Sequence, residues 1–170
     1  MAFETTNKFN HVSGDFLELF LAVASAAVIK VGDMVKWDDG NQNIAAIEDF
    51  WDASEATSQA AIKAAFIGVA MDQSLDGSTD GIRIAGATPQ AIFEFTITST
   101  TVSLGDMVSV EKKSGNLMYG NRLQAGALGT ATQAGVIGRV VGASTFGSAV
   151  TKAKVVFHSE ILSVPMPAEA

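Results

Sequence analysis

The two histidines, His11 and His158, are the side chains of this sequence best suited to proton transfer or metal binding near neutral pH. Neither stands in an H-x-x-x-H or H-E-x-x-H pattern, the spacing that brings two imidazoles to one metal ion. His158 alternates with Lys152 and Lys154, which indicates a strand face turned to solvent or to a partner. The chain has no cysteine, which excludes disulfides, thiolate catalysis and cysteine-ligated zinc. We therefore expect no metal site, no cofactor and no catalytic histidine.

Nucleophiles and phosphate-binding loops are equally hard to place. A hydrolase needs an activated nucleophile beside a base, and no serine lies in a G-x-S-x-G elbow. The glycine-rich run GALGTATQAG at 126–135 lacks the lysine and the strand–loop–helix context of a phosphate-binding loop. We expect that the chain is not an enzyme, and a small hydrolase is the weaker alternative.

Two acidic loops offer carboxylates to a hard cation. The loop WDDGNQN at 37–43 has the oxygen ligands of a calcium loop but not its glycine and glutamate spacing. The loop MDQSLDGSTDG at 71–81 carries Asp72, Asp76 and Asp80 at regular spacing. Cation binding is one interpretation of each loop, and a solvated surface loop is the one we favour.

Composition narrows the classes of partner. The 170 residues contain 11 lysines and arginines against 18 acidic residues, for a formal net charge of −7. Binding to a phosphate backbone requires clustered basic residues, so we expect no direct contact with nucleic acid. The chain is 48% hydrophobic and only 17% charged, below the quarter or so that is usual in soluble domains. This deficit suggests that other subunits cover part of the surface.

The most apolar segment lies near the N-terminus. Residues 19–29 are eleven consecutive uncharged residues, whereas a membrane-spanning helix needs roughly 20. The ASA at 24–26 resembles a signal-peptidase site, but acidic residues precede the apolar stretch, where a signal peptide has positive charge. We expect a buried strand or helix here, and no membrane association.

Most of the chain has the period-two alternation of β-strands. In AIFEFTITS at 91–99, phenylalanine and isoleucine occupy one face while glutamate and threonine occupy the other. Similar patterns, separated by turn-forming residues, predict strands at 29–37, 66–71, 81–86, 136–142 and 152–158. The exception is the alanine-rich segment 52–66, which predicts a helix of about three turns, with Asp52 and Glu55 as a candidate capping box.

A repeated motif organises these strands. The tetrapeptide GDMV occurs at 32–35 and again at 105–108, and each copy is followed by an Ile-Gly strand at 67–70 or 137–140 and then by an alternating strand. This order predicts two related three-strand units, with 91–99 bridging them, that close on each other as a small barrel or sandwich. Chance is the alternative, since Gly-Asp is a common turn pair.

Six residues of the repeat have predicted structural roles. We interpret the Gly-Asp pairs as turn formers, because glycine adopts turn conformations closed to other residues and aspartate bonds to nearby backbone. The in-strand glycines suggest bulges or close backbone approaches. These structural residues are Gly32, Asp33, Gly105, Asp106, Gly68 and Gly138.

The two ends of the chain differ from the middle. Residues 1–14 are polar and aperiodic, and we expect an extended arm in which Phe3, Phe9 and Val12 contact a neighbouring surface, or alternatively fold back on the chain's own core. Residues 15–163 form the single β domain. The tail at 164–170 has two prolines and is expected to be extended.

The order of motifs resembles a family of small phage head proteins that decorate or cement the capsid. The matching pieces cover about residues 30–158: GDMV at 32–35, IGVA at 67–70, AIFEF at 91–95, GDMV at 105–108, IGRV at 137–140 and KVVF at 154–157. The insertion at 52–66 is not part of the family's short pattern. The resemblance implies a small β-barrel on the outer capsid surface, often a trimer, with the major capsid protein as its partner.

The sequence therefore leaves two main functions to compare with the structure. The favoured one is a structural virion protein that binds the outer surface of a phage capsid and bridges its major subunits. The alternative is a carbohydrate- or cell-surface-binding β module that stacks Trp37, Trp51 and Tyr119 on sugars.

Overall fold

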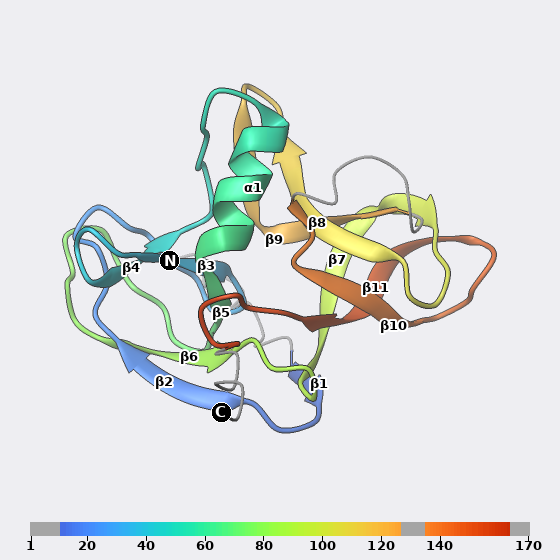
Figure 1. Cartoon of the computed structure of the whole chain (residues 1–170), viewed down its shortest axis with the longest axis horizontal. Helices are drawn as coiled ribbons and strands as arrows, with labels where there is room; N and C mark the ends of the chain where they lie inside the picture. Colours follow the sequence, from blue (N-terminus) through green and yellow to red (C-terminus); the bar gives the residue numbers. More distant parts are fainter. Residues whose placement is uncertain (1–10, 127–134, 164–170) are drawn as a thin grey trace, which may run out of the picture.

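A computed structural model describes residues 11–126 and 135–163, so Phe3, Phe9 and the tail at 164–170 lie outside the described residues. The prediction of a mainly β fold is confirmed, with eleven strands and a single helix in the part of the chain that is described. The strands form two sheets that lie side by side, and the helix stands at their junction (Figure 1). Apart from the short strand β1, each sheet comes from one half of the sequence, and we call the halves the first and the second unit.

The first unit is an antiparallel sheet of five strands in the order β2-β6-β5-β3-β4. Its strands are β2 (Leu17–Leu21), β3 (Met34–Asp38), β4 (Asn43–Ala46), β5 (Phe66–Ala70) and β6 (Ile82–Gly86). The segment between β4 and β5 contains the helix α1 (Glu55–Ala65).

The second unit has the order β7-β11-β10-β8-β9, and β9 also pairs with β7 in parallel, which closes the sheet into a five-stranded barrel. Its strands are β7 (Ile92–Thr101), β8 (Met107–Lys113), β9 (Leu117–Gly126), β10 (Gly138–Ala143) and β11 (Ala149–Phe157). The short strand β1 (His11–Ser13), the end of the expected arm, pairs with the outer edge of β7.

The two units share more than the predicted three strands. When the five strands of each unit are numbered in chain order, both sheets have the same strand order, 1-5-4-2-3. Strand β2 is therefore equivalent to β7, and β4 is equivalent to β9. The register agrees: Val35 of the first GDMV lies opposite Gly68, and Val108 of the second lies opposite Gly138. The interpretation of 91–99 as a bridge is wrong, because this segment is β7, the first strand of the second unit.

The closure of the barrel also has a counterpart in the first unit. In the second unit Ile97 of β7 pairs in parallel with Leu123 of β9. In the first unit an isolated parallel bridge joins Val23, just beyond β2, to Ile44 of β4. Both units therefore bring their first and third strands together in the same direction.

The core consists of two apolar clusters. The smaller one fills the first unit and includes Val35, Ile44 and Ile84. The larger one fills the second unit and continues across the junction to Phe66, whose ring centroid is 5.2 Å from that of Phe157. The two units are therefore joined by core packing.

Helix α1 begins at a different cap from the one that we expected. Its N-cap is Ser54, whose side-chain oxygen accepts a hydrogen bond from the backbone N–H of Thr57 at 3.2 Å. Asp52 lies before the helix, and its backbone N–H donates to the hydroxyl of Ser58 at 2.8 Å. The helix contacts both β3 and β8, and the Gln59 amide donates to the Val110 carbonyl at 2.9 Å. These contacts fix α1 between the units.

The apolar N-terminal segment becomes a strand at the edge of its sheet. Strand β2 leaves Phe20 72% exposed, whereas Val23, Ala27 and Ile29 farther along are buried. No helix within the described residues is long and apolar enough to cross a membrane.

Candidate functional site

The two Gly-Asp pairs lie at equivalent corners. Gly32 and Gly105 have φ of +89° and +87°, in the region that favours glycine. The Asp33 carboxylate accepts the backbone N–H of Lys30 at 2.9 Å, and the Asp106 carboxylate accepts that of Ser103 at 2.7 Å. Both aspartates therefore bind the backbone of their own turn.

The in-strand glycines lie where two backbones approach closely. A Cβ atom on Gly68 would collide with the carbonyl oxygen of Ala85, and one on Gly138 would collide with that of Val156. Strand β5 thus meets β6 in the same way that β10 meets β11. The role of both glycines is steric.

A first cavity, of about 610 Å³, lies between the units and is lined by Asp33, Glu48, Asp49 and Tyr119, among others. Burial raises the pKa of Asp33 to about 6, and the negative charge of Glu48 acts in the same direction. Lys113 pairs with Glu48 at 2.6 Å and with Asp49 at 2.8 Å, which raises the pKa of its ammonium group. These ion pairs tie β8 to the segment that follows β4.

One carboxylate of each acidic loop, Asp38 in the first and Asp72 in the second, has partners within the chain. Asp38 accepts from the side-chain amide of Asn41 at 2.7 Å and from the backbone N–H of Gly40 at 3.1 Å. Asp72 holds the guanidinium of Arg83 by two bonds, of 2.7 and 2.9 Å. Over the described ranges no three histidine or acidic side chains converge as metal ligands would.

The three aromatic residues considered for sugar stacking are packed within the chain. Trp37 lies against the apolar cluster of the first unit. Lys112 lies over the ring of Trp51 at 5.1 Å from its centroid, and Arg122 lies over Tyr119 at 4.5 Å. Each of these rings is therefore already in contact with the apolar core or with a cationic side chain.

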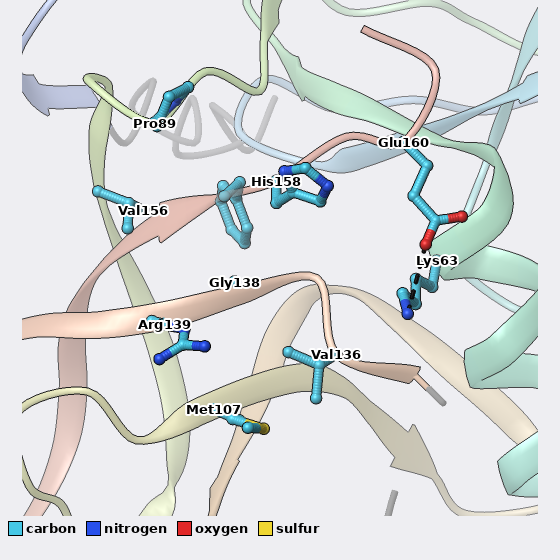
Figure 2. A pocket seen from close by; sticks show the side chains of 10 residues that line it. Lys63, Pro89, Met107, Val136, Gly138, Arg139, Val156, His158 and Glu160 are labelled. Carbon is cyan, nitrogen blue, oxygen red and sulfur yellow. Dashed lines mark ion pairs between the residues drawn. The ribbon is translucent and has the colours of Figure 1, made fainter. Parts of the chain in front are cut away.

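A second cavity, of about 550 Å³, opens on the outer face of β8, β10 and β11. Figure 2 shows Met107, Val136, Arg139 and Val156 around it, with His158 beyond the end of β11. The rim also holds an ion pair between Lys63 of α1 and Glu160 at 3.3 Å. We call this cavity the outer groove.

The outer groove combines apolar walls with positive charge. Arg139 is exposed and makes no ion pair with another described residue. No sequence pattern predicted a role for Arg139, although the repeat contained a signal. Aligned on Ile-Gly, the first unit has Val69 where the second has Arg139.

Further apolar side chains are exposed at the ends of the strands. Leu104 follows β7 and is 70% exposed, and Phe146, between β10 and β11, is 48% exposed. Leu75, in the loop between β5 and β6 of the first unit, is 66% exposed. Of the residues expected to contact a partner, Val12 is exposed on β1, and Phe3 and Phe9 lie outside the described residues.

Comparison with models of known protein families and with curated proteins finds no match to this chain.

Proposed function

We propose that this chain is a structural virion protein that binds the outer surface of a phage capsid and stabilises it by bridging major capsid subunits. The observation that carries the proposal is the doubled unit, in which GDMV corner, Ile-Gly strand and alternating strand recur in one order and register. This is the order of motifs by which the sequence resembles capsid decoration proteins. The partner in this proposal is the major capsid protein, and the chain acts as a homo-oligomer, with a trimer favoured.

The surface of the chain supports a role in protein contacts. Large apolar side chains such as Phe20, Leu75 and Leu104 are between 66 and 72% exposed. They lie on β2, in the loop between β5 and β6, and after β7, so several parts of the surface offer apolar side chains to a partner. Titratable side chains, in contrast, are engaged in turns and ion pairs, as at Asp33, Asp72 and Lys113. A binding role fits this distribution better than a catalytic one.

Stabilisation of a shell would follow from many modest contacts. Each copy would bury apolar side chains over a seam between capsid subunits. Because the copies on one shell act together, weak individual contacts give strong overall resistance to expansion and leakage. Neither nucleic acid nor membrane takes part in this mechanism.

The carbohydrate-binding alternative has less support. Sugar stacking needs an open aromatic face, and Lys112 and Arg122 lie over the rings of Trp51 and Tyr119. No specific feature of the described residues favours it.

The test is to add the purified chain to empty heads of the encoding phage that lack it. We expect stoichiometric coating of the outer surface, seen by cosedimentation and electron cryomicroscopy, and a higher temperature of head disruption. Leu104→Asp combined with Phe146→Asp is expected to weaken coating if the strand ends face the capsid. Heads that remain bare at saturating concentrations of the unaltered chain would contradict the proposal.

A further inference from the structure

One outer face of the first unit is completely buried inside the chain. It lies on β3, β5 and β6, where it faces away from that unit's own apolar cluster and belongs to the larger cluster shared with the second unit. The exposed fraction of its side chains is between 0 and 4%. Its members are Met34, Phe66, Val69, Ala85 and Ala87.

The second unit has an equivalent face on β8, β10 and β11, and the pairing register identifies its members. Met34 lies opposite Val69, and Met107 lies opposite Arg139 in the equivalent strands. One strand farther, Val69 lies opposite Ala85, just as Arg139 lies opposite Val156.

Two more positions complete the equivalence. Phe66 and Val136 each precede the isoleucine of their Ile-Gly strand. The backbone N–H of Ala87 donates to the carbonyl of Ile67, and that of His158 donates to Ile137, at 2.9 and 2.8 Å. Ala87 and His158 are therefore counterparts.

All five counterparts line the outer groove. They are Met107, Val136, Arg139, Val156 and His158. The face that is buried in the first unit is thus open in the second, where it surrounds a cavity of about 550 Å³ (Figure 2). The chain contains one filled copy of this junction and one copy that no described residue fills.

Residues of the second unit that share the larger cluster with this buried face also have counterparts in the first unit. In the second unit the start of β7 contributes Ala91 and Phe93 to the shared cluster, and both are fully buried. Register places Leu17 and Leu19 of β2 at the equivalent positions, because Leu19 pairs with Ile84 as Phe93 pairs with Val155. Leu17 is 50% exposed, whereas Leu19 is partly buried against the first unit's own cluster. The accessible part of this surface is therefore the start of β2 around Leu17.

The charges of the two open surfaces are complementary. Arg139 is an exposed cation in the outer groove. Leu17 lies between two exposed acids, Asp15 and Glu18, and Glu18 also interacts electrostatically with Arg83 of the neighbouring strand β6. An acidic surface with an apolar centre therefore matches a basic groove with apolar walls, as interfaces between specific partners generally do.

From these matches we propose that the outer groove binds a second copy of this chain, which inserts the start of its β2 around Leu17 and sets Glu18 toward Arg139. The contact between copies then repeats the contact that already joins the two units within one chain. The contact is heterologous, because the outer groove of one copy meets the start of β2 of the next copy. Contacts of this kind generate closed rings or open filaments. The inference rests on the duplication, and it supplies the contact surface for the homo-oligomer in the proposed function.

Charge reversal tests the pairing of the two surfaces. The native mass of the full chain is measured by native mass spectrometry and sedimentation from micromolar to hundreds of micromolar concentrations. We expect oligomers for the unaltered chain, and at least tenfold weaker association for Arg139→Glu and for Glu18→Arg. The double variant carries both reversals and is expected to regain oligomers, because the two exchanged charges again attract each other across the contact between copies.

The matched control is Lys152→Glu, which reverses an exposed cation on β11 of the same unit and outside the outer groove. It should leave association unchanged, and circular dichroism reports whether each variant is folded. A monomer at every concentration, unchanged association of Arg139→Glu, or a double variant no better than the single ones would overturn the inference. Oligomers that respond as expected but leave phage heads bare would instead overturn the proposed function alone.

Discussion

Asp33 illustrates how one carboxyl group can both shape a turn and oppose folding. Its side chain accepts the Lys30 N–H, yet burial beside Glu48 raises its pKa from 3.8 to about 6. A raised pKa means that the folded chain binds the proton more tightly than the unfolded chain. Stability from this group is therefore greatest below about pH 4 and is lost as the pH rises toward 6.

Replacing Asp33 by asparagine is expected to remove this pH dependence. Asparagine keeps an oxygen that accepts the Lys30 N–H but carries no charge to desolvate, so the free energy of unfolding at pH 7 should rise. The shift corresponds to at most about 3 kcal/mol at 1.36 kcal/mol per pKa unit. Urea unfolding between pH 4 and 7 measures the difference between the two proteins. A difference that stays constant across this range would contradict the assignment, as would a carboxyl titration of Asp33 by NMR with a midpoint near 4.

At the scale of elements, the contact between β10 and β11 depends on a missing side chain. Gly138 faces the carbonyl oxygen of Val156, and a backbone atom cannot turn aside as a side chain can. Gly142, in the same strand, faces only side-chain carbons of Lys154, the nearest at 3.3 Å. The two glycines of β10 thus make a matched pair for substitution.

Gly138→Ala is expected to lower the free energy of unfolding by about 2 kcal/mol or more, because β10 must move away from β11 to relieve the overlap. Gly142→Ala should change it by less than about 1 kcal/mol, since the Lys154 side chain can shift. Chemical denaturation of both variants gives the comparison. Equal losses of stability in the two variants would show that the close backbone approach at Gly138 is not the reason that a glycine is needed there.

The elements also show how far sequence patterns reach. Alternation identified β7 and β11 because each has one buried and one exposed face. It missed β4, which is short, and β9, in which Gly120 interrupts the pattern. The helix was recognised from its alanines. The pattern favours Asp52 as the cap, because aspartate and serine are both good caps. In the structure the Ser54 side chain accepts the Thr57 N–H, and Asp52 lies before the helix.

Most of the candidate site could not be predicted from sequence patterns. The repeat pointed to the corners at Gly32 and Gly105, where both glycines have a positive φ. Arg139, in contrast, is an ordinary surface arginine until the strands are paired. Its significance comes from the contrast with Val69, which is buried at the equivalent position. That contrast requires the register of β5 and β10, and register is a property of the folded chain.

At the scale of the whole molecule, the two units share one apolar cluster. Phe66 of the first unit is fully buried, and its ring lies 5.2 Å from that of Phe157 in the second. Ion pairs from Lys113 to Glu48 and Asp49 cross the same junction. Since neither unit can expose this cluster without cost, we expect the units to unfold together.

Phe66→Ala tests this coupling, because it removes a large ring of the first unit from the junction, where that ring packs on Phe157 of the second unit. Such a truncation typically costs about 3–5 kcal/mol. We expect one cooperative transition at lower denaturant, and hydrogen exchange that accelerates equally in β3 and β10. Phe20→Ala is the control: this ring is 72% exposed, and its loss should change stability by less than about 0.5 kcal/mol. Faster exchange confined to the first unit would mean that the two units are independent modules. The junction would then be a docking contact between two separately folded units, of the kind that is proposed between two copies of the chain.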